Sequence, residues 1–290
     1  MTDHEFGGEH TELKLEVISS YLQRFNTVLK NQNFERVYID AFAGAGKRLA
    51  AKSNDLFGET RQLLSGSAEI AIQTEPPFHK LVFIDQKKKH VEALRELAKE
   101  HLGREIDCRH GDCNQILPNV LRAINWRNHR AVLFLDPYGM NVDWSTLGEI
   151  SSFKGIDLWY LFPTFGMLRQ APRNPEKIDG IKARSLTRLL GTDDWREALY
   201  ETSSEPDLFG IYHENRLSIP AIDSFVHNRL KEIFPSVLKS APIFDKHGRQ
   251  IFSLYFALTN DSKKAMAVAK PIADYILTPL RQGTRPRSGL

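Results

Sequence analysis

Three groups of residues in the first half of the chain could take part in chemistry: acids that follow apolar runs, glycines, and an Asp-Pro-Tyr-Gly sequence. In "VYIDAFAGAGKR", residues 37 to 48, an apolar run ends at Asp40 and gives way to small residues around Gly44 and Gly46. Glycine permits a positive φ and lets a ligand approach the backbone closely. A turn of this kind after a strand predicts a site for a triphosphate, a dinucleotide or S-adenosylmethionine.

Two of these three ligands fit the glycine turn poorly. The phosphate-loop pattern needs a glycine five residues before its Gly-Lys and a Ser or Thr after the lysine, but the chain has Ala41 and Arg48 at those positions. The dinucleotide pattern needs a third glycine three residues after the second and a helix that starts at once. Position 49 is leucine and a polar stretch follows, so the dinucleotide interpretation is weakened but stays open.

S-adenosylmethionine carries no pyrophosphate, so its methionine part needs only close backbone approach at the turn. Its ribose needs an acid at the end of the second strand, where "VFID" ends in Asp85, and its adenine amino group suits Asp112 in "HGDCN". The predicted cofactor-binding residues are therefore Asp40, Phe42, Gly44, Gly46, Asp85 and Asp112. The alternative is that such acids only cap helices, and for Asp112 the two interpretations carry equal weight.

The fourth apolar run ends in "FLDPYGMN", which places Asp136, Pro137 and Tyr138 at the end of a predicted strand, where open parallel sheets bind ligands. The Asp136 side chain and the Pro137 carbonyl can accept hydrogen bonds from an exocyclic amine, while Tyr138 stacks on the base. Such positioning is the main catalytic tool for methyl transfer, so we predict these three residues as catalytic. The alternative is a β-turn with no chemistry. "DAFAGAG" together with "DPYG" resembles the class I amino-methyltransferases.

Strands and helices alternate regularly around these motifs. An amphipathic helix is predicted from Thr11 to Lys30, and apolar runs predict strands at 36–41, 80–85, 105–109, 130–136 and 156–162, with helices between them. Continuous apolar strands separated by helices are typical of a parallel sheet covered on both faces. Helical patterns follow Pro163, and "APIFDKHGRQIFSLYFALTN" then predicts a hairpin.

The predicted fold is therefore α/β: a doubly wound, seven-stranded, mostly parallel sheet of the Rossmann-like class I methyltransferase type, with a closing antiparallel hairpin and a helical insertion. Three parts are expected. Residues 1–163 form an N-terminal helix and the cofactor-binding core, residues 164–238 form the helical insertion, and residues 239–290 form the hairpin, a last helix and a basic tail.

The order of the motifs is similar to that of the three-Cys-motif partner proteins, a methyltransferase-like bacterial family named for its pairing in genomes with a radical-SAM-like protein. The resemblance covers roughly residues 11 to 163 and the closing hairpin, and it rests on "TELKLEVISSYL", "YIDAFAGAGKR", "LVFID", "GDCNQIL", "VLFLDPYGM" and "LYFALTN". It implies S-adenosylmethionine as cofactor and a radical-SAM-like three-Cys-motif protein as partner.

Composition sets the remaining bounds. The chain has 290 residues, of which 41% are hydrophobic, and a net charge of +3 that is too balanced to indicate a nucleic-acid-binding protein by itself. Lys47 and Arg48 adjoin the glycine turn and, with Phe162 after the fifth strand, are predicted to bind substrate.

No signal-type leader or bilayer-length apolar run is visible. Cys108 and Cys113 predict a cytoplasmic setting and, without a second pair, a structural role and no metal site.

The sequence thus predicts a cytoplasmic S-adenosylmethionine-dependent methyltransferase that acts on an exocyclic amine of a nucleobase in RNA or DNA. The alternative from another class is a non-catalytic partner or adaptor of the radical-SAM-like protein. A third interpretation is a nuclease-type or NAD-type use of the same acids.

Overall fold

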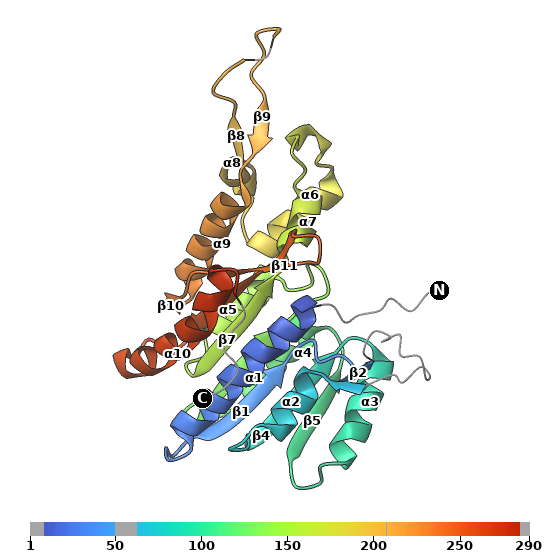
Figure 1. The fold of residues 1–290 in the computed structure, drawn as a ribbon, viewed down its shortest axis with the longest axis vertical. Coiled ribbons are helices and arrows are strands. Elements are labelled where there is room, and N and C mark those ends of the chain that lie inside the picture. The colour runs from blue at the N-terminus through green and yellow to red at the C-terminus, as the bar shows by residue number, and fades with distance from the viewer. Residues whose placement is uncertain (1–8, 50–62, 207, 285–290) are drawn as a thin grey trace.

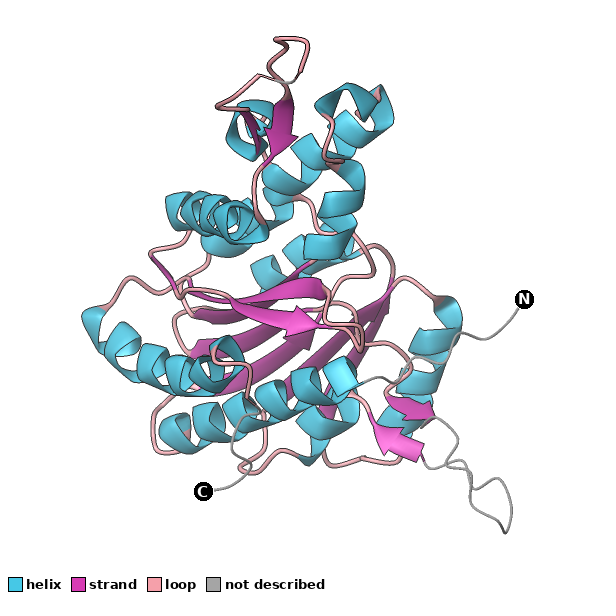
Figure 2. Ribbon diagram, turned by 45° about the horizontal axis from the view of Figure 1, so that its top comes forward, coloured by secondary structure: helices cyan, strands magenta, loops and turns pink. Residues whose placement is uncertain are grey.

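One central sheet with helices on both faces forms the body of the molecule. The computed structural model describes residues 9–49, 63–206 and 208–284 (Figure 1). Figure 2 shows the strands in a single twisted layer, with helices packed above and below it. No helix in these ranges combines the length and the apolar character needed to cross a membrane.

The main sheet has eight strands. Their bounds are β1 (Glu35–Asp40), β4 (Lys80–Asp85), β5 (Glu105–His110), β6 (His129–Leu135), β7 (Ile156–Phe162), β10 (Ser236–Val237), β11 (Ala241–Phe244) and β12 (Gln250–Leu258). Their order is β10-β12-β7-β6-β1-β4-β5, with β11 also paired to β12. Five strands are parallel to one another: β1, β4, β5, β6 and β7. Strand β12 runs antiparallel to β7. The predicted α/β fold with its closing hairpin is confirmed, and the two-residue β10 adds a strand that was not predicted.

Two sets of helices cover the two faces of the sheet. One face carries α1 (Glu9–Leu29), α2 (Ser67–Gln73), α3 (Lys88–Lys99) and α10 (Lys263–Arg281), and the other carries α4 (Cys113–Ala123), α5 (Trp144–Ser151), α7 (Gly180–Leu190) and α9 (Ile219–Ile233). Successive strand side chains point to opposite faces. In β6, Val132 and Phe134 therefore pack toward the first set, whereas Leu133 and Leu135 pack toward the second. Both faces are buried, which explains the continuous apolar runs.

The chain order places a crevice next to β1. From β1 the chain proceeds to β4 and β5 on one side, and then returns to β6 and β7 on the other side of β1. Connections that diverge in this way leave a crevice at the carboxyl ends of the strands, and open α/β sheets bind ligands there. The motifs at the ends of β1, β4 and β6 all lie at this edge.

An arm rises from the carboxyl edge after β7 (top of Figure 1). It contains α7 and α9 together with α6 (Thr164–Gln170), the 3-10 turn η1 (Pro175–Lys177), α8 (Trp195–Leu199), β8 (Tyr200–Thr202) and β9 (Glu214–Arg216). Strands β8 and β9 form a small antiparallel pair of their own. The segment expected to be helical therefore also carries a short hairpin. A second pair, β2 (Lys47–Leu49) and β3 (Leu63–Ser65), follows the glycine turn.

Candidate functional site

A cavity of about 470 Å³ opens at the carboxyl edge of the sheet. Five segments far apart in sequence line it: the start of α1, the glycine turn at 42–46, residues 66–67 at the start of α2, the start of α3, and residues 136–139 after β6. Phe252 of β12 closes one side. The structure thus brings the predicted glycine turn and the predicted Asp-Pro-Tyr-Gly segment to a single cavity.

The glycine turn has the backbone conformation that its sequence suggested. Gly44 and Gly46 have φ values of 63° and 78°, in the region that favours glycine. The amide of Gly66, just before α2, donates to the Gly46 carbonyl at 2.9 Å. A Cβ atom at position 66 would lie 2.5 Å from that carbonyl oxygen. Gly66 is therefore part of the turn, although no pattern in the sequence pointed to it.

Asp40 lies beneath the turn rather than in the cavity. Its side chain is fully buried, where Oδ1 accepts the Phe42 amide at 3.0 Å and Oδ2 accepts the Tyr38 hydroxyl at 3.3 Å. Burial raises the pKa of Asp40 to about 7. The carboxyl group therefore fixes the start of the turn, and Phe42 is the member of this pair that lines the cavity.

Asp85 is also buried, with 2% of its surface exposed. Its Oδ2 accepts the Gly44 amide at 3.0 Å, and its Oδ1 accepts the Lys87 amide at 2.8 Å. The Nδ1 atom of His90 lies 3.1 Å from the same Oδ1. Asp85 thus ties the glycine turn to the start of α3, and the His90 ring, which no sequence motif indicated, lines the cavity.

Asp112 combines the two roles that the sequence left open. It caps α4, because its Oδ1 accepts the Asn114 amide at 2.8 Å. It also lines an adjoining cavity of about 240 Å³, which shares Phe42 with the larger one. Asp112 can therefore cap α4 and still contact a ligand in this cavity.

Asp136 meets a lysine from the N-terminal helix. The Nζ atom of Lys14 lies 2.6 Å from Asp136 Oδ2, and the same ammonium sits 5.0 Å from the centre of the Phe252 ring. Lys14 is only 8% exposed, and it lies on the buried face of α1, one turn from Val17 and Ile18. The position of Lys14 on the apolar face of a predicted helix could have marked it as a functional residue, but the sequence does not show that it pairs with Asp136.

Tyr138 is the most accessible of the three predicted catalytic residues. Its side chain is 46% exposed at the rim of the cavity, and Lys87 Nζ lies 5.3 Å from the ring centre. Burial of the remainder, helped by the nearby acids Asp85 and Asp136, raises the pKa of its hydroxyl to about 12. The ring therefore stays neutral and offers an open face beside Pro137.

Of the predicted substrate-binding residues, Lys47 and Arg48 lie next to the glycine turn, whereas Phe162 lies in the core. Lys47 and Arg48 begin β2, directly after the glycine turn, and their backbones pair with β3; their side chains lie outside what the structure describes. Phe162 is 2% exposed, packs edge-on against Tyr160 and Tyr255, and lines neither cavity. The structure places it in the core, and Phe252 takes the position at the cavity wall.

Neither cysteine belongs to a metal-binding cluster. Within the described ranges no group of three or more His, Cys, Asp or Glu side chains could hold a metal ion. Cys108 is half-buried and Cys113 is buried. Burial raises the pKa of their thiols to about 11 and about 12, respectively. Both therefore remain protonated, unreactive packing groups at neutral pH.

No family model matches the chain, and no curated protein sequence does. Among solved structures, protein LPL1258 of Legionella pneumophila, of the DUF519 family, is similar over 96% of this chain and 95% of its own length, with 12% identity and a TM-score of 0.51. Spermidine synthase bound to the transition-state analogue AdoDATO is 10% identical over 88% of this chain and 62% of its own, with a TM-score of 0.41.

Magnesium protoporphyrin IX methyltransferase from Synechocystis, solved with bound S-adenosylmethionine, is 10% identical over 86% of this chain and 80% of its own, with a TM-score of 0.37. The last two likenesses are too distant to carry an argument. At such low identity the first shows shared fold alone. Together with the strand order, it supports an α/β fold with a mostly parallel central sheet and a closing antiparallel hairpin.

Proposed function

We propose that this protein is an S-adenosylmethionine-dependent methyltransferase that acts on an exocyclic amine of a nucleobase in RNA or DNA. The observation that carries the proposal is the shared cavity: Asp136, Pro137 and the exposed ring of Tyr138 face the same space as the glycine turn. Methyl transfer needs a donor site and an acceptor site that meet, and this arrangement supplies both.

The cofactor would lie along the glycine turn, where Gly44 and Gly46 allow close approach to its methionine part. Asp85 would act on its ribose through the groups that it holds, the Gly44 amide and the His90 ring, since Asp85 itself is buried and lines neither cavity. Asp112, in the adjoining cavity, would accept the adenine amino group. Bound S-adenosylmethionine supplies an electrophilic methyl group.

On the acceptor side, Asp136 and the Pro137 carbonyl would accept hydrogen bonds from the target amine, and Tyr138 would stack on its base. Aromatic stacking of this kind contributes about 1–3 kcal/mol per base. Lys14 orients the Asp136 carboxylate by occupying Oδ2, which leaves Oδ1 for the amine. Held at the glycine turn, the cofactor would supply its methyl group to the nitrogen that Asp136 and the Pro137 carbonyl orient, its carbon–sulfur bond would break, and the amine proton would pass to water.

S-adenosylhomocysteine should raise the melting temperature of the wild-type protein, because a ligand that binds only the folded state stabilises it. Asp85→Ala should remove this shift, since the mutant loses the anchor of Gly44 and His90. Differential scanning fluorimetry measures both. Asp107→Ala is the matched control, because Asp107 lies on neighbouring β5 and bonds only Arg109 within the described chain.

Two outcomes would count against these assignments. An equal shift in Asp85→Ala would show that Asp85 does not support the cofactor site. Absence of any shift in the wild type with S-adenosylhomocysteine would overturn the proposed function itself.

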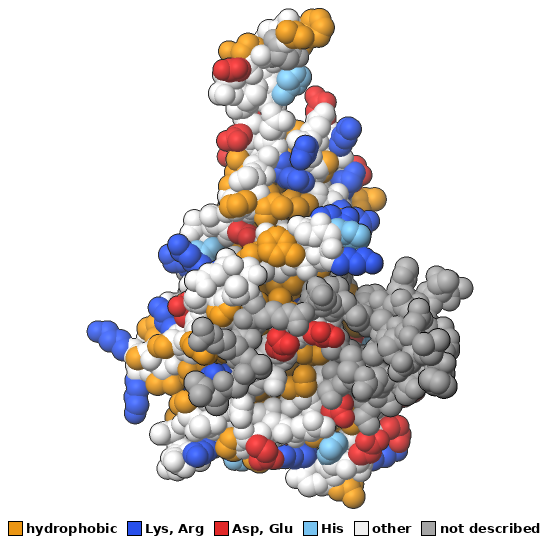
Figure 3. Space-filling view, viewed as in Figure 1, with side chains coloured by type: hydrophobic (Ala, Val, Ile, Leu, Met, Phe, Trp, Pro, Cys, Tyr) orange, Lys and Arg blue, Asp and Glu red, His pale blue; other side chains and the backbone are white. Residues whose placement is uncertain are grey.

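The arm offers a basic surface beside the cavity. Arg173, Lys177 and Arg184 are exposed on or next to η1 and α7, and Figure 3 shows the Lys and Arg side chains gathered on that flank of the arm. Arg188 of α7 reaches the smaller cavity. With Lys47 and Arg48 we propose these residues as the surface that binds nucleic-acid phosphates.

Charge reversal at Arg173, Lys177 and Arg184 should weaken RNA or DNA binding and flatten its dependence on salt. Removal of one phosphate-binding group reduces the slope of log K against log salt by about 0.9 for duplex DNA. Fluorescence anisotropy between low and moderate salt measures this slope. Reversal of Lys99, Arg122 and Lys154, exposed at the opposite edge of the sheet, is the control. An unchanged slope in the arm variant would show that this surface is only solvated.

One observation favours a second candidate function, that of a non-catalytic partner of a radical-SAM-like three-Cys-motif protein. The tip of the arm exposes large apolar side chains, with Leu208 and Phe209 at 101% and 86% and Ile211 and Tyr212 more than half exposed (top of Figure 3). Exposed apolar groups that cluster in this way mark interaction surfaces. Binding of such a protein without methyl transfer to any RNA, DNA or protein would favour this function.

A further inference from the structure

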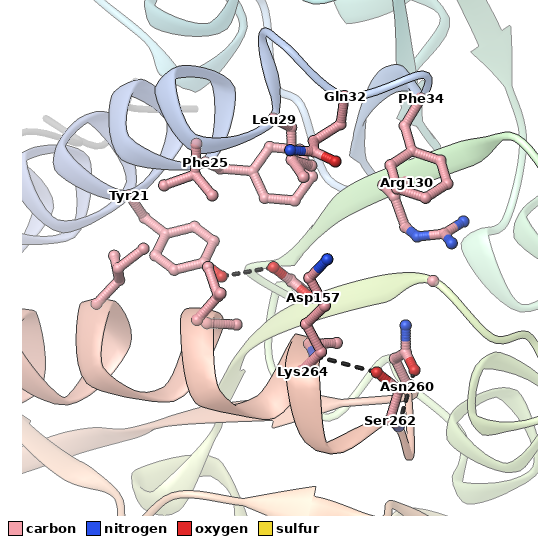
Figure 4. Close-up of a pocket in the computed structure, with 16 residues that line it drawn as sticks. Tyr21, Phe25, Leu29, Gln32, Phe34, Arg130, Asp157, Asn260, Ser262 and Lys264 are labelled. Atoms are coloured by element: carbon pink, nitrogen blue, oxygen red, sulfur yellow. Dashed lines mark hydrogen bonds between the residues drawn. The ribbon is translucent and has the colours of Figure 1, made fainter.

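A second cavity, of about 330 Å³, lies at the opposite edge of the sheet from the candidate site. It is bounded by the C-terminal half of α1, the first turns of α10, and the amino ends of β6 and β7 (Figure 4). Its volume falls in the range of small-molecule sites, about 300–1,000 Å³. Nothing in the proposed methyl transfer uses it.

A half-buried carboxyl group faces this cavity. Asp157 of β7 has its Oδ2 bonded to the Tyr21 hydroxyl at 2.6 Å, while its Oδ1 has no hydrogen-bond partner among the described residues. Burial raises the pKa of Asp157 to about 7. This open acceptor oxygen therefore lies at the cavity wall, where a ligand or water can donate a hydrogen bond to it.

A guanidinium group lies on the same side of the cavity. Arg130 of β6 uses Nη1 to donate to the carbonyls of Trp126 and His129, at 3.0 and 2.6 Å. Its guanidinium stacks over the Phe34 ring, 3.8 Å from the ring centre. The Nε and Nη2 atoms make no hydrogen bond to the described chain, so these donors and the open oxygen of Asp157 line the same cavity (Figure 4).

The walls that lead to these polar groups are apolar. Phe25 and Leu29 of α1 face Ile272 and Val268 of α10 across the cavity. Val28 and Val268 stay 41% and 40% exposed at its mouth. An apolar channel that ends in polar groups, among them the Asp157 acceptor and the Arg130 donors, fits a flat apolar body with a polar head.

We propose that this cavity binds a small flat aromatic molecule whose neutral head donates one hydrogen bond to Asp157 and accepts one from Arg130, as a primary carboxamide or the equivalent edge of a heterocycle does. An anionic head would set a negative group against the Asp157 oxygen. A cationic head would meet the Arg130 guanidinium and the Lys264 ammonium, which both line the cavity. A neutral donor–acceptor head satisfies both sides.

Benzamide, benzoate and benzamidine test the assignment, because they share a phenyl ring and differ in the charge of the head. Saturation-transfer NMR and isothermal titration with the full chain should show benzamide binding most tightly. Val268→Trp, which fills the mouth from an exposed position, should weaken benzamide binding by about tenfold or more, equivalent to 1.4 kcal/mol. Ala267→Trp is the matched control, since Ala267 is exposed on the same helix and does not line the cavity.

Four results would overturn the proposal. Tighter binding of benzoate or benzamidine would contradict the neutral head, and absence of benzamide binding would contradict the site. An unchanged affinity in Val268→Trp, with thermal unfolding like that of the wild type, would place the ligand elsewhere. A wild-type dimer in sedimentation velocity that Val268→Trp dissociates would show that a second copy of the chain covers the cavity.

Discussion

Replacement of Asp136 by alanine is expected to abolish methyl transfer to nucleic acid while leaving the affinity for S-adenosylhomocysteine almost unchanged. The carboxylate lies on the acceptor side of the cavity and makes no bond to the glycine turn. Loss of the group that aligns the amine misdirects its lone pair, and misplacements of about 1 Å cost on the order of 10²-fold in rate. Transfer of a labelled methyl group to unmodified RNA and DNA measures the rate, and calorimetry measures the affinity.

Lys14→Met is expected to lower the rate of methyl transfer less than Asp136→Ala does. The variant keeps the Asp136 carboxylate but removes the ammonium that lies 2.6 Å from it, so the carboxylate is present but no longer held in one orientation. Asp85→Ala is the opposite control, because it should remove cofactor binding first. Retention of full transfer in Asp136→Ala would show that the Asp-Pro-Tyr-Gly segment is only a turn.

Gly66→Ala is expected to lower the affinity for S-adenosylhomocysteine by about tenfold or more, together with the stability of the fold. The new Cβ would stand 2.5 Å from the Gly46 carbonyl oxygen, which is backbone and has no rotamer by which to move away. The turn that the cofactor approaches must therefore shift. Overpacking of this kind typically costs about 1–3 kcal/mol in the free energy of unfolding, which urea denaturation measures.

Gly103→Ala provides the control for Gly66→Ala, because a Cβ atom there has no described neighbour within 4 Å. It should leave both affinity and stability near wild-type values. If Gly66→Ala bound S-adenosylhomocysteine normally, the close approach of the two glycines would serve packing alone, and the cofactor would have to lie elsewhere along the edge.

The main sheet could be predicted because its strands are buried on both faces. The run at 80–85 was predicted to its last residue, and the helix expected from Thr11 to Lys30 spans Glu9–Leu29. The strands that escaped prediction, such as β10 and the β8–β9 pair, have two or three residues each. Segments so short show no periodicity, and only their pairing partners in the folded chain make them strands.

The site was predicted less completely than the fold, for a geometric reason. The sequence shows which acids end a strand but not where their oxygens point, and both Asp40 and Asp85 turn inward to hold backbone amides. The groups that replace them at the cavity come from other elements, Lys14 from α1 and His90 from α3. No local pattern connects residues that only the fold brings together.

The packing of α1 against α10 has a consequence for how the protein is made. The apolar side chains of α1, such as Val17 and Ile18, are buried in one cluster with Ala273 and Leu277 of α10, and Arg24 stacks on Tyr275. A ribosome makes α1 long before α10, so the part of the apolar face of α1 that α10 covers stays exposed through most of synthesis. Because α1 also carries Lys14, the packing that supports the pair with Asp136 is complete only when α10 has emerged. A fragment that ends before α10 should therefore contain every strand of the sheet but expose apolar side chains of α1. We expect such a fragment to aggregate and to lack a complete site.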